Sequence, residues 1–361
     1  MSIIRSISPY IYSTPWVSVG STLTCTSYTL NLYIYSGQKV ADEPASPTDT
    51  ITKINTGALS SGNDEINISR ILADYLETPT VTGTGVQLLD GNAQWWVKTE
   101  VVYTTTSVEA AQYEAYNLFG NGYTYGNEGS NIVAVPDDIL LDGREFKVNR
   151  EGIFLVGIQS LNNAVPATSV KSYPDLEINE AVLAPAVPLA LLDSLESTQY
   201  AWVDLSGTTT DKTCVVNVSG VDIVLLIEDE YKYDPMDIVF LNKYGAMQSL
   251  TFFKEFVKDL NVTKQSYESD NGQPSTGAHQ YRTLNVQGRE GFKVQSGWVD
   301  ETLNETFKQL LLSERVWEFD GTTYIPLNLK SSSLSYKTQK INRLIQYEIE
   351  FEYSFNVINN I

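Results

Sequence analysis

The stretch from Ile345 to Val357, IQYEIEFEYSFNV, has the clearest pattern in the chain. Apolar or aromatic side chains occupy every second position, and polar or acidic side chains stand between them. Because successive side chains of a β-strand point to opposite faces of its sheet, this alternation predicts a strand with one face in a core and the other in water. At about 3.3 Å per residue such a strand would extend roughly 40 Å, which is longer than usual. We therefore expect it to bend between two sheets or to pair outside its own domain.

Other stretches repeat this two-residue period. Residues 28–35 read YTLNLYIY and residues 94–104 read QWWVKTEVVYT, both typical of half-buried strands. The run VDIVLLIEDE at 221–230 is apolar enough for a strand that is buried on both faces. In DIVFLNKYGAMQSLTFF (237–253), Asn242 and Gly245 bracket a turn between two apolar strands, which predicts a hairpin.

Two short segments have the period of an amphipathic helix instead. The first covers residues 68–76, where Asn67 is placed to cap the N-terminus. The second covers residues 302–314, where Thr302 and Glu305 fit a capping box. Its apolar stripe consists of Leu303, Phe307, Leu310 and Leu311. The predicted fold class is therefore mainly β, with β-sandwich or β-barrel modules and two short amphipathic helices.

The length of 361 residues exceeds one ordinary domain of roughly 100–200 residues, so we predict several modules. Residues 1–105 form a β-sandwich-like N-terminal module with one short helix. Residues 106–200 form a β region with long loops, some rich in Gly, Asn and Tyr and others rich in Pro. Residues 201–361 form a C-terminal β module with the hairpin, one helix and the long terminal strand.

The net charge of −20, from 44 acidic and 24 basic residues, disfavours specific binding to a phosphate backbone. No stretch approaches the roughly 20 consecutive apolar residues of a membrane-spanning helix, and the N-terminal residues lack the core of a signal peptide. We therefore expect a soluble protein, made in a cytoplasm, that binds neither nucleic acid nor membrane.

Few residues suit catalysis. His279 is the single histidine, and the two cysteines, Cys25 and Cys214, lie in apparent strands far apart in sequence. The acidic groups at 228–230 and 137–142 can be solvated turns, although paired carboxylates also suit a glycosidase or a calcium site. We predict a protein that is not an enzyme, with no catalytic residue, cofactor or metal.

Aromatic side chains are the candidates for a binding surface. Trp95 and Trp96 adjoin on one strand, so one of them faces away from the core and can contact a partner protein or a sugar ring. The predicted interface residues are Trp96, the loop aromatics Tyr116, Phe119, Tyr123 and Tyr125, and Tyr347, Phe351 and Phe355 of the terminal strand. Packing within the chain is the alternative for each of them.

Three C-terminal stretches carry a resemblance to a known class of proteins. They are FLNKYGAMQSLTFF (240–253), GWVDETLNETFKQLLLSERVWEF (297–319) and YIPLNLKSSSLSYKTQKINRLIQYEIEFEYSFNVINNI (324–361). The N-terminal order of SPYIY, TLNLYIYSG and INISRILADYLE agrees with it. Together these stretches resemble structural virion proteins of tailed bacteriophages that infect Bacteroidetes, especially tail and baseplate-like proteins, with a neck ring as a further possibility.

The resemblance implies a structural subunit of a virion. Such a subunit would form a symmetric homo-oligomeric ring and bind other tail or neck proteins. This assembly would take place in the cytoplasm of the bacterial host. It implies no enzymatic residue. The alternative function is a phage adhesin that binds a receptor or a glycan, which the exposed aromatics would serve.

Overall fold

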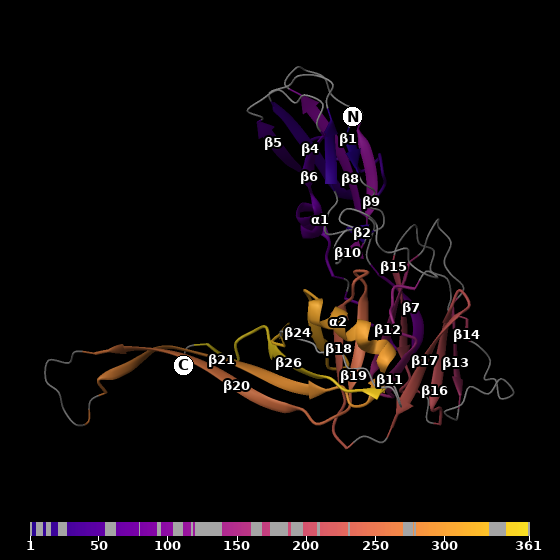
Figure 1. Ribbon diagram of the computed structural model, residues 1–361, viewed down its shortest axis with the longest axis vertical. Coiled ribbons are helices and arrows are strands. Elements are labelled where there is room, and N and C mark those ends of the chain that lie inside the picture. The colour runs from indigo at the N-terminus through magenta and orange to yellow at the C-terminus, as the bar shows by residue number, and fades with distance from the viewer. Residues whose placement is uncertain are drawn as a thin grey trace.

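The computed structural model describes residues 2–4, 10–11, 16–20, 27–54, 63–78, 80–91, 95–103, 111–116, 118–119, 139–159, 168–173, 187–188, 198–207, 210–229, 232–269, 277, 279–331 and 344–359. This part of the chain is mainly β, as predicted, and contains two short α-helices. It consists of an N-terminal sandwich, a larger body and a long two-stranded arm that projects from the body (Figure 1).

The N-terminal sandwich has a four-stranded antiparallel sheet in the order β5–β4–β8–β9 and a three-stranded sheet in the order β1–β3–β6. The first contains Ser27–Ser36 (β4), Asp49–Ile54 (β5), Trp95–Tyr103 (β8) and Gln112–Tyr116 (β9). The second contains Ser2–Ile4 (β1), Trp16–Gly20 (β3) and Asn63–Asn67 (β6). A short parallel pair joins Tyr10–Ile11 (β2) to Leu118–Phe119 (β10).

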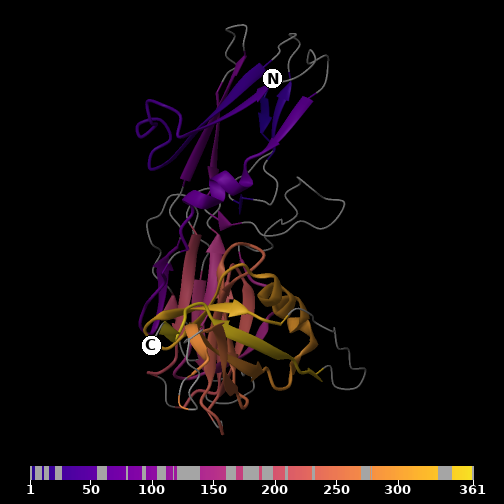
Figure 2. The same cartoon turned by 90° about the vertical axis from the view of Figure 1, so that its left-hand side faces the viewer.

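The helix Ser69–Tyr75 (α1) closes the core of this sandwich. Its Leu72 is fully buried among the inward side chains of β4, including Leu30 and Leu32. The predicted cap is wrong by one residue, because the N-cap is Ile68, whose side chain makes no cap hydrogen bond; the Asn67 Oδ1 accepts a hydrogen bond of 2.9 Å from the Ser69 N–H. Figure 2 shows α1 between the N-terminal sheets and the body.

Three sheets form the body. The first, in the order β11–β17–β16–β13–β14, contains Glu145–Asn149 (β11), Thr168–Tyr173 (β13), Val187–Pro188 (β14), Thr213–Val218 (β16) and Val221–Glu228 (β17). The second, in the order β12–β15–β7, contains Val86–Asp90 (β7), Ile153–Gln159 (β12) and Thr198–Asp204 (β15).

The third sheet of the body has eight strands, which begin with the predicted hairpin and end with the arm. Along the order β19–β18–β23–β24–β26–β21–β20 it contains Met236–Leu241 (β18), Met247–Phe252 (β19), Val257–Glu268 (β20), Tyr281–Gln295 (β21), Val316–Phe319 (β23), Tyr324–Leu329 (β24) and Glu348–Tyr353 (β26). Ile358–Asn359 (β27) pairs beside β21, and Val299–Asp300 (β22) pairs with Leu344–Ile345 (β25).

Strand pairing crosses the module boundaries predicted from the sequence. β7 lies before residue 105 but pairs with β15 in the body, and β9 lies after residue 105 but pairs with β8. One continuous core then takes buried side chains from Leu88 to Tyr353, so the regions 106–200 and 201–361 share it. The chain enters the body with β7 after the segment ETPTVTGTG (77–85) and returns to the sandwich with β8.

The second helix begins later than predicted and has a different cap. A 3-10 turn, Glu301–Leu303 (η3), leads into Asn304–Leu312 (α2), and the Asp300 Oδ1 accepts the hydrogen bond from the Thr302 N–H at 2.8 Å. The capping box assigned to Thr302 and Glu305 is therefore wrong, because the 3-10 turn moves the cap to the preceding aspartate. The predicted stripe is correct, with Leu303, Phe307 and Leu310 buried.

The terminal strand is shorter than its pattern predicts. The alternation holds from Ile345 to Tyr353, where every second side chain is buried. Phe355 and Val357 are exposed instead, because β26 ends at Tyr353 and the Ser354 N–H turns to the carbonyl of Pro326. One strand of roughly 40 Å is thus replaced by β25, β26 and β27.

Asp237 of β18 is a buried carboxyl group that holds neighbouring strands. It accepts hydrogen bonds from the Thr251 hydroxyl at 2.5 Å and from the Ile153 N–H at 3.3 Å. Burial raises the pKa of Asp237 to about 6, although the two hydrogen bonds oppose this shift. Between the pKa values of the unfolded and folded states, the folded protein keeps a proton that the unfolded chain has lost.

This raised pKa predicts that the free energy of unfolding falls as pH rises from about 4 to about 7. Asp237→Asn removes the ionisable group. The free energy of unfolding of the variant minus that of the wild type should therefore increase by up to about 3 kcal/mol as pH rises over that range. Urea denaturation at both ends of the range measures the difference, with the exposed Asp74→Asn as a control. An equal difference at both pH values would contradict the assignment.

Candidate interaction surface

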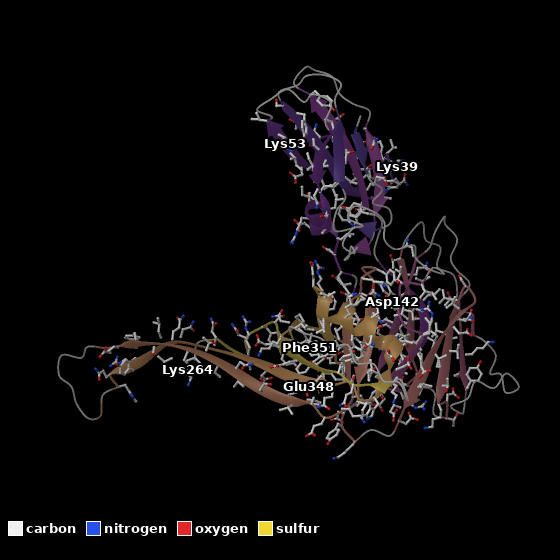
Figure 3. The ribbon with its side chains drawn as sticks, viewed as in Figure 1. Lys39, Lys53, Asp142, Lys264, Glu348 and Phe351 are labelled. Atoms are coloured by element: carbon white, nitrogen blue, oxygen red, sulfur yellow. The ribbon has the colours of Figure 1, made fainter. Side chains whose placement is uncertain are left out.

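The arm is an antiparallel ribbon made by β20 and β21 (Figure 3). Its pairing runs from Val257 opposite Lys293 at the body to Glu268 opposite Tyr281 at the far end. The register shifts by one residue between Gln265 and Ser266, which indicates a β-bulge. Every residue of β20 is exposed, so this strand contributes nothing to the core of its own chain.

Strand β21 is anchored in the body at one end and free at the other. Phe292 and Val294 are buried in the core, and β26 pairs with residues 291–295. The two strands pass so closely that a Cβ on Gly291 would lie 2.9 Å from the Phe351 carbonyl oxygen. β27 pairs with Gln287 and Gly288, and in the described part of the chain no strand other than β20 pairs with residues 281–286.

We call residues 261–268 and 281–286 the distal arm. A two-stranded ribbon with water on both faces is marginally stable by itself, because it has no third strand or helix to bury its side chains. β20 is also an edge strand, whose outer side presents unpaired backbone N–H and C=O groups. The distal arm therefore has the properties of a segment that is completed by a partner.

Exposed apolar side chains concentrate on the arm. Of the 12 large apolar side chains exposed in the described part, six lie on β20 and β21: Val257, Leu260, Val262, Tyr267, Tyr281 and Leu284. Phe355 and Val357 add two more beside the arm, since the Val357 N–H donates to the Gly288 carbonyl at 2.8 Å. A concentration of this kind marks an interaction site, whereas single exposed apolar residues need no explanation.

The charged side chains differ between the two ends of the arm. Near the body, Arg289 and Lys293 form ion pairs with Glu352 at 3.2 Å and Glu348 at 3.3 Å. On the distal arm, Lys264 and Arg282 have no carboxylate of the described residues within ion-pair distance. The distal arm thus presents these two cations and one carboxylate, Glu268, among exposed apolar side chains.

The interface residues predicted in the first half of the chain have different surroundings. Trp96 is half-buried; its Nε1 donates to the Gly37 carbonyl at 3.0 Å, and the Lys39 ammonium lies 5.4 Å from its ring. Tyr116 is buried in the core of the sandwich. Phe119 lies in β10, and Tyr123 and Tyr125 lie outside the described residues.

Of the three aromatic residues predicted as interface residues on the terminal strand, two are buried and one is exposed. Tyr347 and Phe351 are buried, with the Tyr347 hydroxyl donating to Asn304 and the Phe351 ring 5.5 Å from that of Phe292. Tyr347 thus contacts α2, and Phe351 packs against β21. Phe355 is exposed and stacks on Tyr353 with ring centroids 5.5 Å apart.

Three of the residues considered for catalysis, Asp229, Cys214 and His279, lie in the described part of the chain. Asp229 accepts hydrogen bonds from Arg150 and Lys212, each at 2.7 Å, and these cations lower the pKa of its carboxyl to about 2. Burial raises the pKa of the Cys214 thiol to about 12. His279 is exposed near the end of the arm. Among the described residues, no three His, Cys, Asp or Glu side chains gather as a metal site.

A cavity of about 290 Å³ lies at the root of the arm. Trp298 stands at its edge with 52% of its surface exposed. The other lining residues are Lys147, Glu228, Lys232, Tyr233, Phe253, Lys254, Ser296 and Gly297. Three lysines and three aromatic rings against one glutamate make this hollow a second candidate binding site.

No protein-family model matches the chain, and no curated protein sequence matches it. In the described part, neither helix has the length and apolar character needed to cross a membrane.

Phe351 and Phe355 allow a direct test of which terminal aromatics belong to the core. Phe351→Ala should lower the free energy of unfolding by about 3–5 kcal/mol, because it leaves a cavity beside Phe292. Phe355→Ala removes a ring that is 47% exposed, so a loss below about 1 kcal/mol is expected. Denaturant titration measures both, and similar losses for the two variants would contradict this division.

Proposed function

We propose that the chain is a non-enzymatic structural subunit of a tailed-bacteriophage virion, placed in the tail, the tail hub or baseplate, or the neck. The observation that supports this proposal is the distal arm, which carries exposed apolar side chains and extends away from the body of its own chain (Figure 1). The sequence resemblance to phage tail and baseplate-like proteins supports the same class. The subunit acts by packing against other subunits in a symmetric ring.

The energetics of the arm favour an assembly role. Burying an apolar side chain contributes about 1.5–3 kcal/mol when it is fully removed from water. Six such side chains on one narrow ribbon are enough to bind a partner, even though ordering the ribbon opposes this gain. The net charge of −20 disfavours a DNA duplex as that partner, so a protein surface is the better fit.

This proposal predicts that the chain is found in purified virions. Mass spectrometry should detect it there, and cryo-electron microscopy should place it in a ring of the tail or neck. Absence from the particle would contradict the proposal.

Substitutions on the arm should reduce incorporation into particles without unfolding the subunit. Tyr281→Ser/Leu284→Ser removes two side chains that are 67% and 68% exposed. The matched control is Val40→Ser/Ile54→Ser, because these side chains are 71% and 77% exposed on the N-terminal sandwich. Quantitative mass spectrometry of particles should show loss of the arm variant by about tenfold or more and full incorporation of the control. Equal incorporation of both would exclude the arm as the assembly contact.

A second candidate function is glycan binding by a phage adhesin, favoured by the cavity at the root of the arm. An exposed tryptophan beside a hollow that also contains Tyr233, Phe253 and three lysines suits stacking on a sugar ring. The lysines in the lining would favour an acidic saccharide. Trp96 suits this role less, because Lys39 already lies over its ring.

If glycan binding is the function, wild-type protein should bind acidic saccharides on a glycan array. Trp298→Ala should then weaken binding by about tenfold, which corresponds to the loss of one stacking contact. Trp96→Ala serves as the matched control and should leave binding unchanged. Absence of binding by the wild type would remove this candidate.

A further inference from the structure

Charge is distributed unevenly between the arm and the rest of the chain. Residues 257–295 contain five basic and four acidic residues, a net charge of +1. The remaining chain contains 19 basic and 40 acidic residues, a net charge of −21. Within it, residues 120–256 alone contain eight basic and 20 acidic residues, a net charge of −12. The arm is thus close to neutral, whereas the rest of the chain taken together is strongly acidic.

Both faces of the distal arm combine a cation with apolar side chains. The register places Lys264 directly opposite Val286 and Arg282 directly opposite Tyr267. Directly opposed side chains of an antiparallel pair lie on the same face of the sheet. A partner for this ribbon therefore needs acidic groups beside apolar area.

The outer face of the sheet around β17 has this complementary composition. Ile223, Leu225 and Ile227 point into the core, so Asp222, Val224 and Leu226 point outward. Glu145 of β11 stands opposite Val224 and shares this outer face.

The outward side chains around β17 form an apolar centre with an acidic margin. Glu145 and Asp222 are exposed, and Val224 and Leu226 are half-buried. The neighbouring Lys147 and Glu228 lie 3.9 Å apart and neutralise each other. Lys171 of β13 shares this outer face, because it stands opposite Val215, which stands opposite Val224. Among these side chains the carboxylates outnumber the cations by one.

The distal arm lies far from this face, although the face borders the cavity at the root of the arm, which Lys147 and Glu228 also line. In Figure 1 the arm extends to the left, and the sheet that contains β17 lies on the right. The arm of one chain therefore points away from its own acidic face, and Figure 3 shows Lys264 far out on that arm. Two different patches that bind each other make a head-to-tail contact, which closes into a ring when the rotation between copies allows it.

We propose that the partner of the distal arm is a second copy of this chain, bound through the outer face of β11 and β17. Lys264 and Arg282 of one copy face Glu145 and Asp222 of the next, and the apolar side chains of the ribbon cover Val224 and Leu226. This proposal rests on the proposed assembly function and names the contact that the assembly uses.

Charge reversal tests the contact in solution with the full chain. The donor variant is Lys264→Glu/Arg282→Glu, and the acceptor variant is Glu145→Lys/Asp222→Lys. Sedimentation velocity over a concentration series should show self-association of the wild type in low salt and weaker association in high salt, because salt screens exposed charges. The association of each variant should be weaker than that of the wild type by about tenfold or more, because attraction is replaced by repulsion at two positions.

Combining the four substitutions in one chain restores opposite charges across the contact with both signs exchanged. This swap variant should associate within about threefold of the wild type. Lys53→Glu/Arg70→Glu makes the same charge change as the donor variant on exposed residues of the N-terminal sandwich, and it should associate like the wild type. Circular dichroism and thermal unfolding of each variant confirm that the fold is retained.

Three results would overturn the proposal. They are a wild type that stays monomeric at high concentration in low salt, a donor variant that associates like the control, and a swap variant that fails to recover. Particle composition is independent of these measurements. A chain that is present in virions but fails this test keeps the proposed function and loses the contact, whereas a chain that self-associates in this way but is absent from virions keeps the contact and loses the function.

Discussion

The packing of Phe292 on β26 decides where the arm leaves the body. Its ring lies 5.5 Å from the rings of both Phe351 and Tyr353, in a core that also contains α2 and the hairpin of β18 and β19. Because Phe292 and Val294 hold only the last third of β21, the strand is rigid where it enters the core and unsupported beyond Gln287. The ribbon is thus held to the body mainly through this one end of β21.

The sequence predicts those parts of the fold in which each strand buries one face beside its neighbours. The alternation from Ile345 to Tyr353, the hairpin around Asn242 and the stripe on α2 all depend on local period, and the structure confirms them. Pairing between distant segments has no such signal. β7 joins β15 across more than a hundred residues, and nothing in VQLLD distinguishes a strand of the sandwich from one of the body.

The arm escaped prediction for a related reason. A strand that buries neither face has no hydrophobic period, and VKDLNVTKQSYE reads as a polar segment. The terminal strand shows the converse, since Phe355 and Val357 continue the pattern after their strand has ended. An apolar pattern in the sequence indicates which side chains are removed from water. It does not distinguish burial in the chain's own core from burial by a protein partner. The aromatics assigned to an interface were therefore divided between core and surface only by the structure.

The register shift opposite Gln265 and Ser266 bears on how the exposed edge of the arm can pair with other strands. A long, straight edge strand is a template for uncontrolled fibril growth, because each added strand exposes a new identical edge. The bulge interrupts the regular spacing of backbone groups on β21, where Leu284 is the extra residue, and Lys258 and Lys264 place charge along the edge strand β20. Indefinite stacking of ribbons is thereby discouraged, while a side-chain contact with a shaped surface is left open. The exposed apolar side chains of the arm therefore lie on a pair of strands whose irregular, charged edges oppose repeated strand addition.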